Sequence, residues 1–257
     1  MHFSLAFLAS IAACCGLSSA YPGPAASVSQ ELARRNCSSE ISAFNLPRRE
    51  QRNVKRSTYY PSLRNLTCIL APEAILEDYI SNPPIRQDVT EGQVGIAMTL
   101  DIGVLDVTTC KPLPNVMVEI WSPNAQGEYG ASSLRGAFPA GSNGIAEFQT
   151  IFPGFTSEGA NHINVMVHTS SSASSEVAHV GQIFFTDKWT TIIGMQSPYN
   201  TNTHPRVTNL DDPVYAAANQ AGFYPVVDIE SIHDDWPDGV IGYITVGVDP
   251  SQSRNAS

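Results

Sequence analysis

The chain has 257 residues, of which 42% are hydrophobic and 15% charged. This composition is that of an ordinary globular protein and excludes a disordered chain, and the length allows one sizeable core. The net charge of −10 disfavours nucleic acid as a partner, because a phosphate-binding surface requires clustered Lys and Arg.

The N-terminus has the pattern of a secretory signal peptide. An apolar run of about 14 residues from Phe3 to Gly16 precedes small residues at Ser18 and Ala20, which predicts residues 1–20 as the signal, cleaved after Ala20. The run is shorter than the roughly 20 residues that a bilayer requires, so we expect no membrane span and an extracellular location. Asn-x-Ser/Thr sequons agree with a secreted glycoprotein; they begin at Asn36, Asn65 and Asn255.

Residues 21–58 are expected to form an N-terminal arm or pro-segment with short helices. Basic residues gather from Arg48-Arg49 to Lys55-Arg56, and three interpretations stay open: a polyanion patch, a solvated helix face, or a dibasic processing site. Once the signal has left, Cys37, Cys68 and Cys110 remain. This odd number allows one disulfide within the chain, and the sequence does not choose among the three pairs.

Residues 59–250 are expected to form a mainly β, two-sheet sandwich, followed by a flexible tail at 251–257. Short runs rich in Val, Ile, Phe and Thr alternate with turn residues, and they predict strands at 93–107, 115–122, 144–151, 162–168, 180–185 and 240–248. The stretch 196–224 has no strand pattern, and we expect it to cover the sandwich with a helical turn at 215–220.

One candidate site follows from the residues alone. Tyr129 ends a turn, and the alternation of strand 162–168 puts His162, Asn164, Met166 and His168 on one side. A strand histidine with a polar neighbour is suited to binding a metal or a substrate, but a hydrogen-bonded structural histidine is the commoner role. The sequence contains no nucleophile elbow, phosphate loop or Cys-x-x-Cys zinc pattern.

Several ordered motifs resemble the secreted intradiol ring-cleavage dioxygenases, which act on catechol and protocatechuate. The central motifs begin with Trp121-Ser-Pro-Asn-Ala-Gln-Gly-Glu-Tyr129 and continue with Leu134-Arg-Gly136, Thr150-Ile-Phe-Pro-Gly154 and His162-Ile-Asn164. Further landmarks extend the resemblance from Cys68 to Asn202; they are Cys68–Glu73, Pro84–Asp88, Thr109–Pro112, Gly181–Phe185 and Pro198–Asn202. The resemblance implies the intradiol type of β-sandwich.

The resemblance also implies a chemistry. Members of the family hold Fe(III) with two Tyr and two His, chelate a catechol, and insert both oxygens of O₂ to give a cis,cis-muconate. Phenolates are hard anions that stabilise Fe(III). By position, Tyr129 and His162 correspond to a Tyr and a His ligand with catalytic roles, and Gln182 corresponds to the Gln that supports developing charge.

Three positions depart from the family pattern. Thr156 stands where the second Tyr is expected, Asn164 where the second His is, and Gly159 where an Arg is. Because neither Thr nor Asn is a strong donor to a hard trivalent ion, the sequence predicts a much lower affinity for Fe(III) and lost or much reduced ring cleavage. The alternative is a non-catalytic extracellular protein that binds a small aromatic or serves as a cell-wall scaffold. Substitute ligands would have to come from His168, Tyr199 or Tyr224.

Overall fold

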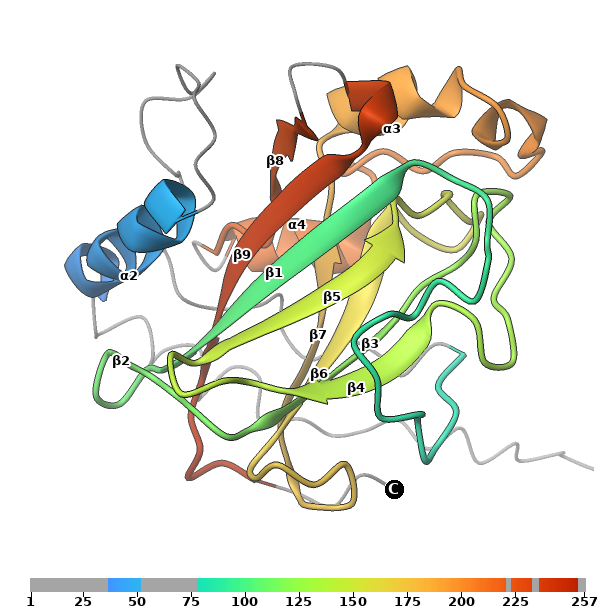
Figure 1. Ribbon diagram of the computed structural model, residues 1–257. Helices are drawn as coiled ribbons and strands as arrows, with labels where there is room; N and C mark the ends of the chain where they lie inside the picture. The colour runs from blue at the N-terminus through green and yellow to red at the C-terminus, as the bar shows by residue number, and fades with distance from the viewer. Residues whose placement is uncertain (1–36, 52–77, 221–222, 233–235, 254–257) are drawn as a thin grey trace, which may run out of the picture.

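A computed structural model describes residues 37–51, 78–220, 223–232 and 236–253 (Figure 1). The expected signal peptide, the landmark at Cys68, the sequon asparagines and the dibasic pair Lys55-Arg56 lie outside the described residues. For these parts the sequence-based expectations stay predictions.

Two β-sheets form the body of the protein. Strand β1 is central to the first sheet, where it pairs in parallel with β9 and antiparallel with β5 and β2. This sheet contains β2 (Lys111–Pro112), β1 (Ala97–Asp106), β9 (Val240–Val248), β8 (Asp228–Ser231) and β5 (Ile145–Ile151). The second sheet is antiparallel, in the order β4 (Arg135–Pro139), β3 (Met117–Trp121), β6 (His162–His168) and β7 (Val177–Phe184).

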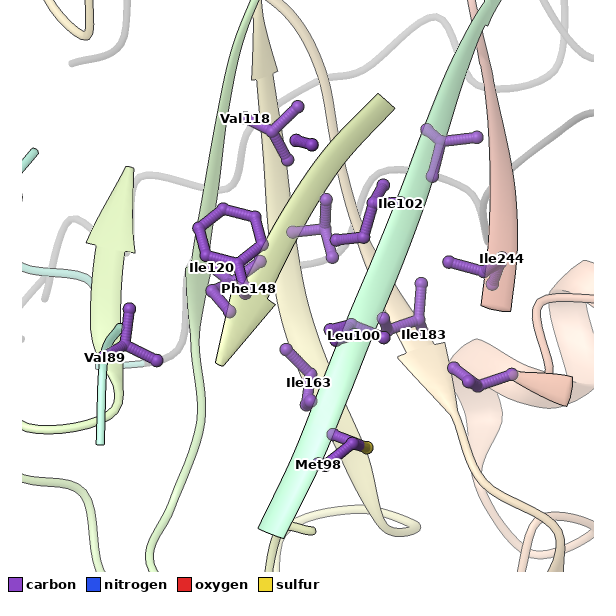
Figure 2. Close-up of a cluster of buried hydrophobic side chains, with 14 of the residues drawn as sticks. Val89, Met98, Leu100, Ile102, Val118, Ile120, Phe148, Ile163, Ile183 and Ile244 are labelled. Atoms are coloured by element: carbon purple, nitrogen blue, oxygen red, sulfur yellow. The ribbon is translucent and has the colours of Figure 1, made fainter. Parts of the chain in front are cut away.

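The core lies between the two sheets. Figure 2 shows Leu100, Phe148 and Ile244 from the first sheet, with Ile120 and Ile163 from the second, in one apolar cluster. These side chains are buried because successive residues of a strand point to opposite faces, so every second residue enters the core. The polar residues between them must therefore face outward from each sheet.

Short helices connect the strands and cover them. The helix α4 (Pro213–Gln220) contains the helical turn predicted at 215–220. The other helices are α2 (Ser38–Gln51), α3 (Asp187–Gly194), η1 (Tyr199–Thr201) and η3 (Trp236–Asp238). Within the described ranges, no helix has both the length and the apolarity needed to cross a membrane.

The described part of the N-terminal arm is helical, as expected, over α2 (Ser38–Gln51), and it is tied to the sandwich. A disulfide joins Cys37 at the start of α2 to Cys110 in the turn between β1 and β2. Among the three pairs that the sequence leaves open, the structure forms this one. Ile41 of α2 is buried in one cluster with Leu105 and Val107, so the arm also packs through apolar contact.

The structure confirms the mainly β, two-sheet sandwich and differs in its details. The predicted strand 162–168 has the observed bounds of β6. The first predicted strand starts later, at Ala97, because a turn occupies the preceding residues, where Gln93 N donates to Thr90 O. Three strands are absent from the prediction, namely β2, β4 and β8.

Candidate functional site

Strands β6 and β7 carry three polar side chains on the face away from the core. Ile163 fills the core, so its neighbours His162 and Asn164 point outward. Asn164 lies directly opposite Gln182 in the register of the two strands, and His162 lies one step away on the diagonal. Each of these three side chains is at most 3% exposed. Buried polar groups of this kind require hydrogen-bond partners.

A tight loop after β3 brings Tyr129 to these residues. The Asn124 side-chain oxygen accepts hydrogen bonds from Gln126 N (2.9 Å) and Glu128 N (3.1 Å), which closes the loop. Gly127 has a φ of +85°, a conformation that L side chains rarely adopt. The Trp-x-x-Asn-x-x-Gly-x-Tyr motif is therefore the sequence of a turn whose last residue, Tyr129, reaches the site.

A second segment packs against that loop and places Thr156. Gly154 N donates to Asn124 O at 3.0 Å, and a Cβ on Gly154 would lie only 2.4 Å from Ala125 O. Asn202 Nδ2 holds the same segment by donating to Phe155 O at 2.8 Å. Thr156 is buried, and its hydroxyl oxygen accepts from Glu158 N at 3.2 Å.

Tyr129, Asn164, Gln182 and His162 form one continuous hydrogen-bonded set, which we call the amide network. Asn164 Nδ2 donates to Tyr129 Oη at 3.0 Å, and Gln182 Nε2 donates to Asn164 Oδ1 at 3.3 Å. Gln182 Nε2 also faces His162 Nε2 at 3.1 Å, and His162 Nδ1 lies 2.7 Å from Ala160 O. Because a backbone carbonyl only accepts, the imidazole proton is on Nδ1, and Nε2 accepts from Gln182.

Burial keeps His162 neutral. Loss of solvent is the largest influence and lowers the pKa of His162, while the Ala160 carbonyl and the Asp212 carboxylate act in the opposite direction with smaller effects. The neutral form is also the one that the amide network requires, since a proton on Nε2 would oppose the N–H of Gln182. Burial and hydrogen bonding therefore favour the same protonation state.

This protonation state predicts a pH dependence of stability. The unfolded chain takes up a proton near the ordinary histidine pKa of 6.5, whereas folded His162 does not. Below that pH the unfolded state binds more protons than the folded state. The free energy of unfolding should therefore decrease as the pH is lowered, by up to about 1.4 kcal/mol per pH unit. Urea titrations from pH 7.5 to 5.5 should show this slope reduced in His162→Gln and retained in the control His204→Gln. Equal slopes in all three proteins would contradict the assignment.

Arg135 fixes the position of the Tyr129 ring. Its Cζ lies 5.6 Å from the ring centroid of Tyr129, within the range of a cation–π contact. Its guanidinium donates to Gly130 O at 2.7 Å and to Asp78 O at 2.5 Å. Burial lowers the pKa of Arg135, and the nearby Asp78, Tyr129 and Glu119 counteract this. The phenol is thus held by an amide at its oxygen and by a cation at its face.

Asp212 is a second positioning residue, and sequence reasoning missed it. One carboxylate oxygen accepts from Ala160 N at 2.7 Å, and the other accepts from Tyr215 N at 2.8 Å in the first turn of α4. Asp212 therefore caps the helix and holds the residue whose carbonyl orients His162. An Asp directly before Pro213 is a helix-start signal that was available in the sequence. A Cβ at Gly159 would lie 2.8 Å from Asp212 Oδ2 and 3.7 Å from His162 Cε1.

Two of the residues considered as substitute ligands are engaged elsewhere. His168 Nε2 lies 3.3 Å from Glu119 Oε2 in a buried pair, and burial raises the pKa of Glu119. The Tyr199 hydroxyl donates to Phe152 O at 2.6 Å and accepts from Ile96 N at 3.0 Å. Both side chains are fixed by contacts that do not involve the amide network.

The donors around Tyr129 and His162 do not fit a ferric ion. Tyr129 Oη and His162 Nε2 each accept from an amide, and the other side chains of the amide network offer only two carboxamides. Fe(III) prefers several anionic oxygen donors together with imidazole, and this set supplies one of each type.

Comparison with solved structures places this architecture among known proteins. The intradiol ring-cleavage dioxygenase from Tetranychus urticae superposes with a TM-score of 0.63 and 28% identity, over 71% of this chain and 96% of that one. The chain has the intradiol ring-cleavage dioxygenase fold. The dioxygenase domain of a carbohydrate-binding fusion protein from Streptomyces sp. SirexAA-E gives a TM-score of 0.51 and 22% identity, over 70% of this chain and 98% of that one.

The same fold is found in enzymes of lower sequence identity. Catechol 1,2-dioxygenase from Pseudomonas arvilla C-1 superposes with a TM-score of 0.52 and 15% identity, over 86% of this chain and 74% of that one. No protein-family model matches the sequence, and a search of curated proteins finds no significant match. The intradiol fold brings the three expected site residues Tyr129, His162 and Gln182 together, and their chemical roles stay predictions.

Proposed function

We propose that this protein is a secreted relative of the intradiol dioxygenases that does not cleave aromatic rings. The fold and the ordered motifs support the kinship, and the apolar N-terminal run with its small residues before Ala20 supports secretion. Thr156, Gly159 and Asn164 stand where the resemblance expects a Tyr, an Arg and a His. The protein keeps the sandwich and has a different set of side chains at its centre.

The amide network is the observation that carries this proposal. A ring-opening site needs donors that are free to hold a ferric ion and a group that is free to accept the catechol proton. Here Tyr129 Oη accepts from Asn164, and His162 Nε2 accepts from Gln182. Both atoms therefore already have a hydrogen-bond donor in the position that a metal would take. Opening the network would remove the partner of Asn164 Nδ2 and one of the two partners of Gln182 Nε2, and a buried donor left unpaired costs about 1–3 kcal/mol.

Oxygen consumption tests the proposal directly. The secreted protein, supplied with Fe(III) and with catechol, protocatechuate or hydroxyquinol, should consume no O₂ above the rate of Fe(III) alone. Heat-denatured protein with the same iron is the blank, and a ferric intradiol enzyme is the positive control. Turnover that saturates with a catechol and produces a muconate would overturn the proposal.

Without ring cleavage, the protein can serve as a structural scaffold or bind a ligand. Because Tyr129 Oη, His162 Nε2 and Asn164 Oδ1 already accept hydrogen bonds within the amide network, a scaffold role fits better than binding of an aromatic at these residues. Equilibrium dialysis against catechol and vanillate should show no saturable binding. Saturable binding that is lost in Tyr129→Phe would instead support the aromatic-binding alternative.

A further inference from the structure

A buried histidine–carboxylate pair joins two strands of the second sheet, in which β3, β6 and β7 lie side by side (Figure 1). His168 is the last residue of β6, and Glu119 of β3 lies opposite Met166, two residues earlier in β6. His168 Nε2 is 3.3 Å from Glu119 Oε2, and the two side chains are 0% and 3% exposed. Met166 and Val177, the residue opposite His168, belong to an apolar cluster on the same face. The pair is therefore shielded from solvent.

Both ring nitrogens of His168 face oxygen atoms. Nδ1 lies 3.2 Å from Ser175 O, a backbone carbonyl that only accepts hydrogen bonds, so Nδ1 must carry a proton. Nε2 faces the carboxyl group of Glu119, and an ionised carboxylate also only accepts. A ring with a proton on Nδ1 alone would place the Nε2 lone pair against that carboxylate, which is costly in a buried site. A second proton is therefore required between Nε2 and Oε2, on either atom.

The charged groups around the pair do not replace this proton. Burial is the largest influence on Glu119 and raises its pKa, while His168 and, to a smaller extent, Arg135 of β4 lower it. The Arg135 guanidinium already donates to Gly130 O and to Asp78 O. Burial, followed by the charge of Glu119, raises the pKa of Tyr79 to about 12, so this phenol is neutral at neutral pH.

Two titratable groups on the side of β7 point away from the pair. Glu176 follows Ser175 in the chain but is exposed, and its carboxylate accepts from Ser253 Oγ. His179 lies opposite Val167, a residue of the core, and opposite residues of paired strands share a face. The charge of the pair therefore depends on the proton that it shares.

The pair attaches the turn between β6 and β7 to β3. Ser175 belongs to this turn, and its carbonyl and Glu119 contact the two nitrogens of one ring. A backbone hydrogen bond of 2.6 Å from Met117 N to Ser170 O joins the same turn to the start of β3. We propose that His168 and Glu119 form a pH-sensitive contact, in which one shared proton holds the turn on β3 and is released when the protein unfolds above neutral pH.

The shared proton links folding to pH in the alkaline direction. In an unfolded chain, histidine and glutamate have ordinary pKa values of about 6.5 and about 4.3, so above neutral pH neither holds an extra proton. The folded pair keeps one, and the folding equilibrium constant should therefore decrease about tenfold for each unit of rising pH. Between these two ordinary values both states hold one proton at the pair, so the separate effect of His162 governs the slope there.

The slope of stability from pH 7 to 9 tests the shared proton. In Glu119→Gln, the new amide donates to His168 Nε2 in place of the proton, so this variant should lack the tenfold decrease per pH unit that urea titrations show for the unaltered protein. Glu128→Gln is the matched control, because it removes the carboxylate of the exposed His204–Glu128 pair, which has a similar distance of 3.1 Å. The control should keep the slope of the unaltered protein.

Equal slopes in the unaltered protein and in Glu119→Gln would overturn the proposal. A second measurement uses only the unaltered protein and decides the matter where the variant fails to fold. Unfolding by urea at pH 8 in weakly buffered solution should release about one proton per chain. Absence of proton release, or proton uptake, would contradict the shared proton. Neither measurement involves iron or a catechol, so the outcome is independent of ring cleavage.

Discussion

The double variant Thr156→Tyr with Asn164→His is expected to bind Fe(III) more than about 100-fold more tightly than the unaltered protein does. Asn164 is the central member of the amide network, since it contacts both Tyr129 and Gln182. Its replacement frees Tyr129 Oη and His162 Nε2 and adds an imidazole, while Tyr at position 156 adds a second phenol. Two phenolates and two imidazoles are then available to one ion.

Iron analysis and a visible phenolate absorption band after desalting measure this gain. The matched control is Thr156→Phe with Asn164→Gln, which changes the same positions without adding a metal donor. The single variant Asn164→His should give an intermediate affinity. Equal iron in the double variant and its control would show that these positions do not surround a common centre.

Gly154→Ala is expected to lower the free energy of unfolding by about 3 kcal/mol, at the upper end of overpacking effects. A Cβ at this position would lie 2.4 Å from Ala125 O and 2.5 Å from Asn124 O, and both atoms belong to the backbone. The segment from Pro153 to Thr156 and the loop that carries Tyr129 would have to separate. For a protein of this size the Tm should fall by roughly 10 °C.

Gly194→Ala provides the matched control for this prediction. Gly194 ends α3, and a Cβ built there meets no atom within 4 Å. Alanine is also the better helix former, so the control should keep or slightly raise the Tm. Similar losses in the two variants would mean that the close approach of Gly154 to the loop does not contribute to stability.

The parts of the fold that were predictable are those with a regular alternation of apolar and polar residues. Strand β6 has this pattern at every position except Met166, and it correctly placed His162 and Asn164 on the outward face. The missed strands lack it: β2 has two exposed residues, β4 contains Gly136 and Pro139, and β8 has the sequence Asp-Ile-Glu-Ser. These strands form because neighbouring strands present backbone groups that need hydrogen-bond partners. The local sequence does not show which segments will become neighbours.

The candidate site was predictable only as far as its strands and motifs. The turn motif and the strand alternation found Tyr129 and His162, and the resemblance to the intradiol dioxygenases added Gln182; the structure brings all three together. Arg135 and Asp212 were missed as site residues: Arg135 reaches Gly130 and Tyr129 across a loop whose path the sequence does not show, and the contact of Asp212 crosses a long sequence separation. Asp212 reaches Ala160 over 52 positions, and no local pattern contains that distance.

Motifs shared with the intradiol dioxygenases have structural reasons to persist here. Asn124 and Gly127 shape the Tyr129 loop, Gly154 packs against that loop, and Asn202 holds Phe155 O. None of these roles requires a metal. Retention of the motifs therefore supports the fold, and it does not by itself support the ring-opening reaction.

The iron content of the unaltered protein is the most direct test of the central claim, that the amide network occupies the centre of the site. The purified protein should be loaded with excess Fe(III), desalted, and measured for iron and for visible absorption. The account predicts substoichiometric iron and a colourless solution. One ferric ion per chain with a phenolate band that disappears in Tyr129→Phe would contradict it.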